Sequence, residues 1–169
     1  MCSESETLAD RLIALEGLPE QVASARAYVD AVLGPDHPIN FAVKIVVSEL
    51  FTNAINHTWS GAPQGRVWLL IEQLDTGDAV RVDVFDEGSD SEPRVLRPTE
   101  VKVPAPRRSE ESSYFDNPKD ADLFGRGLWL VQTLSRKWDT YEHDLGRTAN
   151  GRAVYCVVPH QLPPLPVLG

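Results

Sequence analysis

The chain has few cysteines, few lysines and no long apolar run, and each scarcity narrows what the protein can be. Two cysteines in 169 residues, one of them at position 2, give no basis for a disulfide framework. No apolar run approaches the roughly 18 residues that a membrane-spanning helix needs. The polar start MCSESETLADR resembles neither a signal peptide nor a transit peptide. Together these absences favour a reduced, soluble, cytoplasmic protein with no membrane partner.

Positive charge is scarce as well. The sequence holds 16 lysines and arginines against 25 acidic residues, so its formal net charge is −9. Nucleic acids and anionic membranes attract clustered lysine and arginine, and a direct nucleic-acid partner is therefore not expected. The length suits one domain, large enough to bury a core without a structural metal or disulfide.

Hydrophobic periodicity predicts three helices and five strands. The clearest helix has an apolar stripe formed by Val43, Val46, Val47, Leu50 and Ala54. Helices are expected at residues 20–34, 41–58 and 125–138, and strands at 11–17, 66–74, 79–87, 138–144 and 152–159. This order favours an α+β two-layer sandwich, in which three helices cover one face of a mixed, mostly antiparallel sheet.

The domain is expected to span residues 11–159, after a disordered N-terminus (1–10) and before a proline-rich tail (160–169). Residues 88–124 interrupt it with five prolines and little periodicity. A loop of this length within one domain is usually functional or disordered.

Three polar side chains recur at every fourth position in SELFTNAINHT, namely Glu49, Asn53 and His57. On a helix they fall within a sector of about 80°. The row follows the edge of the apolar stripe, so all three side chains are expected to be half-buried. Two interpretations stay open for this segment alone: border residues with local hydrogen bonds, or a site that coordinates a cation and handles a proton.

Two glycine-containing segments have similar alternatives. VDVFDEGSD puts Asp86 at the end of a strand with Gly88 two residues on, which suits either a ligand amine or a plain turn. LFGRGLWLV puts Gly125, Arg126 and Gly127 at the start of a helix, which suits either phosphate binding or a hinge. The sequence contains no P-loop or nucleophile elbow, and its histidines lack metal-ligand spacing.

Taken in order, these segments resemble the GHKL (Bergerat-fold) ATP-binding superfamily. ELFTNAINH is similar to its N box, DEG to its first glycine box and GRGLWLV to its second. Within the superfamily the chain is most similar to the small bacterial serine/threonine kinases that act as anti-sigma factors. LVQTLSRKW and the expected final strand also fit, and the similarity covers roughly residues 11–159.

The resemblance implies roles for the polar row. Asn53 would be the Mg²⁺ ligand, as a neutral oxygen donor beside a triphosphate. Glu49, one turn earlier, would be the general base for the attacking hydroxyl. His57 belongs to the same box but receives no chemical role.

It also implies how the nucleotide would be held. Asp86 would accept a hydrogen bond from the adenine amino group, and Gly88 would permit a close approach of the base. Gly125, Arg126 and Gly127 would close on the phosphates of ATP. Residues 88–124 would form the ATP lid, whose ordering on nucleotide binding would explain its irregular composition.

The function implied is that of an ATP-dependent protein serine/threonine kinase. Its substrate would be an anti-sigma-factor antagonist, its second partner a sequestered sigma factor, and the family allows a homodimer. One alternative is a nucleotide-binding regulator without phosphoryl transfer. The Gly151-Arg152-Ala153 segment favours this interpretation, because relatives often carry threonine after the glycine. The presence of Glu49 opposes it. Another is a histidine-kinase catalytic domain, less expected because no dimerisation helix with a phosphoacceptor histidine precedes residue 11. The sequence names neither the sigma factor nor the antagonist.

Overall fold

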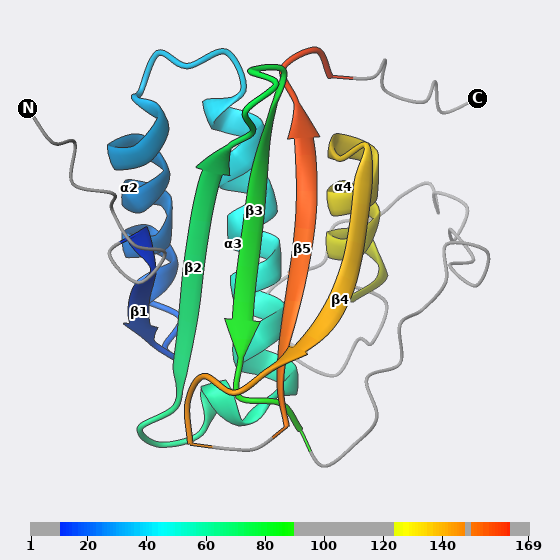
Figure 1. Ribbon diagram of the computed structural model, residues 1–169. Helices are drawn as coiled ribbons and strands as arrows, with labels where there is room; N and C mark the ends of the chain where they lie inside the picture. Colours follow the sequence, from blue (N-terminus) through cyan, green and yellow to red (C-terminus); the bar gives the residue numbers. More distant parts are fainter. Residues whose placement is uncertain (1–10, 90–123, 148–149, 163–169) are drawn as a thin grey trace, which may run out of the picture.

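The fold is an antiparallel sheet with helices on one face (Figure 1). The computed structural model describes residues 11–89, 124–147 and 150–162. Within these ranges five strands form one sheet in the order β1-β2-β3-β5-β4, and every neighbouring pair is antiparallel. The strands are β1 (Ile13–Glu16), β2 (Arg66–Gln73), β3 (Ala79–Asp86), β4 (Lys137–His143) and β5 (Gly151–Pro159).

Within the described residues, three α-helices are present, and they lie on the same side of this sheet (Figure 1). They are α2 (Gln21–Leu33), α3 (Asn40–His57) and α4 (Phe124–Leu134), and a short 3₁₀ helix, η1 (Trp59–Gly61), follows α3. The predicted α+β two-layer sandwich is therefore confirmed. The expected disordered start, most of the expected lid at 88–124 and most of the proline-rich tail lie outside the described residues, so those boundaries stay predictions.

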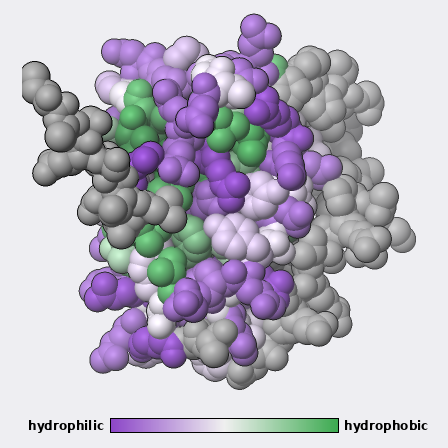
Figure 2. All heavy atoms as spheres, in the orientation of Figure 1, coloured by the Kyte–Doolittle hydropathy of each residue, from purple (hydrophilic) through white to green (hydrophobic). Residues whose placement is uncertain are grey.

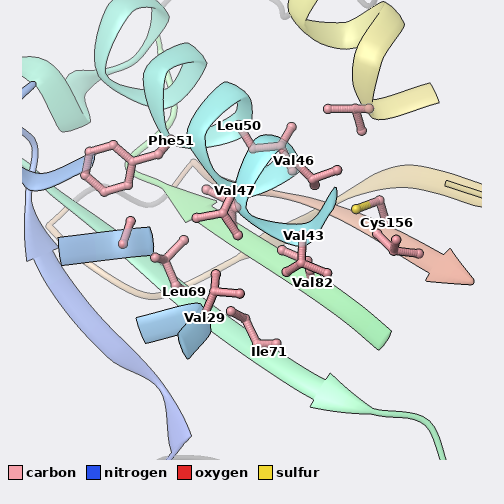
Figure 3. Close-up of a cluster of buried hydrophobic side chains, with 14 of the residues drawn as sticks. Val29, Val43, Val46, Val47, Leu50, Phe51, Leu69, Ile71, Val82 and Cys156 are labelled. Atoms are coloured by element: carbon pink, nitrogen blue, oxygen red, sulfur yellow. The ribbon is translucent and has the colours of Figure 1, made fainter. Parts of the chain in front are cut away.

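The core lies between α3 and the sheet. Val43, Val46, Val47 and Leu50 are all almost fully buried, as their helical spacing predicts. They meet valines, leucines and isoleucines of the central strands, with Cys156 at the β5 side (Figure 3). Each buried side chain of this size contributes about 1.5–3 kcal/mol relative to exposure. This packing holds α3 in place along the sheet.

The start of α3 is tied to α2 by polar contacts. The buried Asn40 amide donates to Asp30 Oδ1 at 2.9 Å and to the Gly34 carbonyl at 2.8 Å. Lys44 pairs with the same aspartate at 2.6 Å. These bonds satisfy polar groups at the helix junction and leave the other end of α3 for the polar row.

The opposite face of the sheet has a smaller apolar cluster and a polar network (Figure 2). Arg81 donates to both oxygens of the buried Asp83 at 2.7 Å, and Tyr141 donates to the same carboxylate at 2.8 Å. The cluster comprises Leu70, Phe85 and Ala153, with Leu12, Trp68, Tyr141 and Leu145 packed against it. Asp83 is thus a paired structural carboxylate, on the face away from the helices.

The C-terminal boundary of the third helix differs from the prediction. The expected helix at 125–138 is observed as α4 at Phe124–Leu134, and Lys137 already begins β4. The Arg136 N–H donates to the Val157 carbonyl at 2.9 Å. Pairing with β5 therefore begins where helical spacing alone would continue to Trp138.

The structure bears on two expectations from the sequence: that the cysteines form no disulfide framework and that the chain has no membrane-spanning helix. Cys156 is a free cysteine, and its burial raises the pKa of the thiol to about 12. A thiol of this kind is inert as a nucleophile at neutral pH. In the ranges that the structure describes, no helix is both long and apolar enough to cross a membrane.

Candidate functional site

The polar row on α3 is only partly buried. Glu49 and Asn53 are half-buried, as expected, but His57 is exposed, so the prediction of a half-buried row is wrong at its last member. Each step of the row turns about 40° towards the stripe, so rotation does not account for this exposure. His57 is the last residue of α3 and lies beyond Ala54, the last buried residue of that helix. Neither Glu49 nor Asn53 makes a side-chain hydrogen bond or ion pair in the described ranges. Their polar atoms are available to a ligand.

Asp86 lies at the end of β3, on the face that the helices cover. Val80, Val82 and Val84 belong to the core, and side chains two apart on a strand share a face. Asp86 is 7% exposed, and its carboxylate accepts a hydrogen bond from the Gly88 N–H at 2.7 Å. Burial raises its pKa to about 6, against the opposing effects of Gly88 and Arg152. The side chain is a buried carboxylate directed towards the helix layer.

Gly88 is required by the protein's own backbone. Its φ is +73°, and a Cβ there would lie 2.0 Å from the Asn150 carbonyl oxygen. Its carbonyl accepts the Trp59 N–H at 2.7 Å. The expectation that this glycine serves a close ligand approach stays a prediction, but the turn before β5 already excludes any side chain.

The second glycine segment lies at the start of a helix, as expected. Gly125, Arg126 and Gly127 are in the first turn of α4, which begins at Phe124. The first four N–H groups of an α-helix have no intrahelical acceptor. These backbone donors, with the positive end of the helix dipole, suit an anionic group.

These segments converge at one end of the fold. In Figure 1, β3 and α3 both end at the bottom, and α4 runs antiparallel to α3 beside it. The second half of α3, which carries Glu49 and Asn53, therefore lies between the end of β3 and the beginning of α4. The residues that would form the lid between β3 and α4 fall mostly outside the described ranges.

Sequence reasoning missed a second layer of contacts behind Asp86. Glu87 is 1% exposed, and both its oxygens pair with Arg147, at 3.2 and 3.0 Å. Its N–H donates to the hydroxyl of the fully buried Ser60 at 2.9 Å. No sequence signal links residues 60 positions apart, so only the structure reveals this pair.

The residues present fit a magnesium nucleotide. Asn53 offers an uncommitted carboxamide oxygen, a donor type that Mg²⁺ accepts. Asp86 offers a buried acceptor for an exocyclic amine, and the first turn of α4 offers N–H donors for phosphate oxygens. Glu49 offers a half-buried carboxylate that can accept a proton.

The chain is similar to one described family and to known proteins. Residues 15–154 match the family model described as "Histidine kinase-like ATPase domain". The chain is 27% identical over 135 residues to "Serine-protein kinase RsbW" from Listeria monocytogenes, covering 76% of this chain and 77% of that protein. Among solved structures, it is similar to "Mycobacterial sensor histidine kinase MprB", with a TM-score of 0.46 and 15% identity over 88% of this chain and 97% of the other.

Proposed function

The chain belongs to the family of histidine kinase-like ATPase domains, and from this premise we propose that it is an ATP-binding protein serine kinase. More specifically, we propose a kinase of the anti-sigma-factor type. It would phosphorylate an anti-sigma antagonist and hold a sigma factor inactive. Such a protein would act in the cytoplasm, where its partners and ATP are found.

Asp86 is the observation that carries ATP binding. Asp86 is 7% exposed, and within the described residues no guanidinium or ammonium group donates a hydrogen bond to its carboxylate. A buried charge without such a partner is costly. The unfavourable free energy of this buried charge is explained if the Asp86 carboxylate binds a ligand. The adenine amino group is a donor of the right kind, and its hydrogen bond to a desolvated carboxylate discriminates strongly against bases without that amine.

Glu49 and Asn53 support phosphoryl transfer. Magnesium, when bound at Asn53, would neutralise charge on the β- and γ-phosphates of ATP. Glu49 lies one turn before Asn53 on the same helix face and is half-buried. It would accept the proton of the attacking serine hydroxyl, a contribution worth about 10²–10⁴ in rate.

The assignment to serine as acceptor draws on the relative whose name states that activity. At 27% identity this relative suggests a reaction type and not a particular partner. The retained Glu49 favours transfer over a purely binding role.

The first test is calorimetric titration of the purified protein with ATP, with and without Mg²⁺. We expect magnesium-dependent binding that is lost in a folded Asn53→Ala variant. Lys44→Ala, on the same helix but paired with Asp30, is the control and should retain ATP binding. Absence of binding at millimolar ATP would refute the proposed nucleotide site.

The second test is transfer of labelled γ-phosphate to candidate antagonist proteins. A labelled antagonist in the presence of the wild-type chain would establish the kinase activity. ATP binding with no transfer to any partner that forms a complex with the chain would instead support a nucleotide-binding regulator.

A further inference from the structure

The ion pair between Glu87 and Arg147 lies directly behind the proposed adenine contact. Glu87 follows Asp86 in the chain, and its side chain is 1% exposed. The Arg147 side chain is half-exposed, and its guanidinium donates to both carboxylate oxygens. A buried carboxylate is costly unless it is paired, and a bidentate arginine fixes its orientation as well as its charge.

Arg147 belongs to the turn between β4 and β5, and this turn is fitted closely against the end of β3. Gly146, at φ +94°, lies so near Trp68 that a Cβ would come within 2.7 Å of its ring. The Asn150 carbonyl faces Gly88, where a Cβ would lie at 2.0 Å. The turn therefore contacts the end of β3 at both Glu87 and Gly88.

The 3₁₀ helix η1 holds the same two residues from another direction. The Trp59 N–H donates to the Gly88 carbonyl at 2.7 Å, and the Ser60 hydroxyl accepts the Glu87 N–H at 2.9 Å. Glu87 and Gly88 are thus held between η1 and the β4–β5 turn. The ion pair between Arg147 and Glu87 joins the β4–β5 turn to this segment.

The position of the Asp86 carboxylate depends on this arrangement. Its Oδ1 accepts the Gly88 N–H at 2.7 Å, so a displacement of Gly88 would move or release the carboxylate. A hydrogen bond to an adenine amine is sensitive to displacements well below 1 Å, because its strength falls steeply with distance and angle.

We propose that Arg147 is a positioning residue for base recognition: by holding Glu87, it fixes the Asp86 carboxylate where it meets the 6-amino group of an adenine nucleotide. The inference rests on the proposed function and adds to it a residue outside the family motifs. Arg147 acts through Glu87 and Gly88, without touching the nucleotide.

Removal of Arg147 should weaken recognition of the adenine base and leave binding of the triphosphate unchanged. Within the described ranges, the hydrogen bonds and ion pairs of Arg147 go to Glu87 alone. Asn53 and the first turn of α4 lie on other elements, so binding of the magnesium triphosphate should not depend on Arg147.

The test compares ATP with ITP, which has a carbonyl oxygen in place of the 6-amino group and the same ribose triphosphate. Dissociation constants of both magnesium nucleotides are measured by calorimetry for the wild type and Arg147→Ala. We expect the wild type to prefer ATP strongly and Arg147→Ala to lower the ATP:ITP preference about tenfold, the effect of one weakened hydrogen bond to a charged group. Affinity for ITP should stay unchanged.

Arg136→Ala is the matched control. Arg136 is 44% exposed and pairs with Asp78 at 2.8 Å, at the opposite end of β3. Its removal also deletes a half-exposed ion pair, but it should leave the ATP:ITP preference at the wild-type value. A general loss of stability would raise the dissociation constants of ATP and ITP by the same factor, whereas loss of a positioning residue changes the ratio of the two constants.

The outcomes separate the two proposals. If the wild type binds no ATP, the proposed function fails and this inference fails with it. If the wild type prefers ATP and Arg147→Ala keeps the full preference, the inference alone is overturned. Should Arg147→Ala not be folded at the assay temperature, Arg147→Lys is measured. A lysine keeps the charge without the bidentate geometry, so an intermediate preference supports the inference and an unchanged one overturns it.

Discussion

The backbone N–H of Gly88 donates a hydrogen bond to the carboxylate of Asp86, two residues earlier, at 2.7 Å. This bond favours the ionised carboxylate, and so does the charge of Arg152, whose Cα lies opposite that of Asp86 in the register of β3 and β5. Burial outweighs both and raises the pKa to about 6 from 3.8. Asp86 is therefore a carboxylate at a position where its charge is unfavourable. Side chains of this kind are often found at functional sites.

Asp86→Asn should stabilise the protein while it weakens ATP binding. Because the folded-state pKa lies above the unfolded value, the folded protein binds this proton more tightly, and stability falls as pH rises from about 4 to 6. Above pH 6 the full cost applies, on the order of 3 kcal/mol. Asparagine removes the charge and retains an oxygen for Gly88. Urea unfolding at pH 7.5 should show a gain of about 1–3 kcal/mol, with ATP affinity reduced at least tenfold.

Asp83→Asn is the control for this prediction, since it makes the same change in the same strand. Asp83 is buried but paired with Arg81 and Tyr141. Removing its charge should destabilise the protein by about 1–3 kcal/mol, because hydrogen bonds to a charged group are lost. Equal signs for the two substitutions would contradict the distinction drawn between a paired and an unpaired buried carboxylate.

ATP affinity should fall in mild acid. The adenine amine binds the ionised form of Asp86, so nucleotide binding competes with the proton. As pH decreases through about 6, the carboxyl becomes protonated and affinity drops, approaching about tenfold for each further pH unit. Calorimetric titrations from pH 8 to 5 measure this. ITP, titrated in parallel, corrects for protonation of the triphosphate itself, and identical profiles for the two nucleotides would exclude Asp86 as the cause.

Most of the fold was predictable because the apolar spacing is regular. Val43, Val46, Val47 and Leu50 mark the buried side of α3 without ambiguity, and all four are buried. The end of α4 was not predictable on the same grounds. Trp138 follows Leu134 at helical spacing, yet it packs against the core from β4. Competition between helix continuation and strand pairing is a tertiary effect that a local pattern does not contain.

In the candidate site, too, some residues could be predicted from the sequence and others could not. Asp86 and Gly88 could be recognised from a strand followed by a glycine turn. The contacts that hold this turn could not, because Ser60 and Arg147 lie 27 and 60 residues from Glu87 and share no periodicity with it. His57 shows the limit of extending a row by residue type alone, since it is the last residue of α3 and is exposed at the end of the helix.

Glu49→Ala should separate binding from transfer. Glu49 is half-buried and makes no hydrogen bond or ion pair in the described part of the chain, so its loss should not disturb the fold. If it is the general base, phosphate transfer to the antagonist should fall by about 10²–10⁴ while the dissociation constant for ATP stays within about twofold. Quench-flow transfer and calorimetry measure the two quantities.

Glu49→Gln is the more conservative companion of this variant. It keeps the size and hydrogen-bonding reach of the side chain but cannot take up a proton, so transfer should be lost to a similar degree. Transfer at the wild-type rate in either variant would show that Glu49 is not the base.

Gly88→Ala should destabilise the protein far more than Gly77→Ala, although both glycines have similar backbone angles. Their φ values are +73° and +67°, so an alanine at either position costs about 1–2 kcal/mol from the left-handed conformation alone. At Gly77 a Cβ meets nothing within 4 Å, whereas at Gly88 it would lie 2.0 Å from the Asn150 carbonyl oxygen. That contact involves backbone on both sides and cannot be relieved by rotating a side chain.

The β4–β5 turn would have to move away from β3 to admit the alanine. We expect a further cost of about 1–3 kcal/mol, and a lower ATP affinity in whatever fraction remains folded, because the Gly88 N–H would no longer hold the Asp86 carboxylate. Urea unfolding of both variants gives the difference in free energy, since Gly77→Ala removes the conformational contribution common to both. Equal free energies of unfolding would mean that the turn yields without cost, and the close fit between Gly88 and Asn150 would then contribute nothing to the position of Asp86.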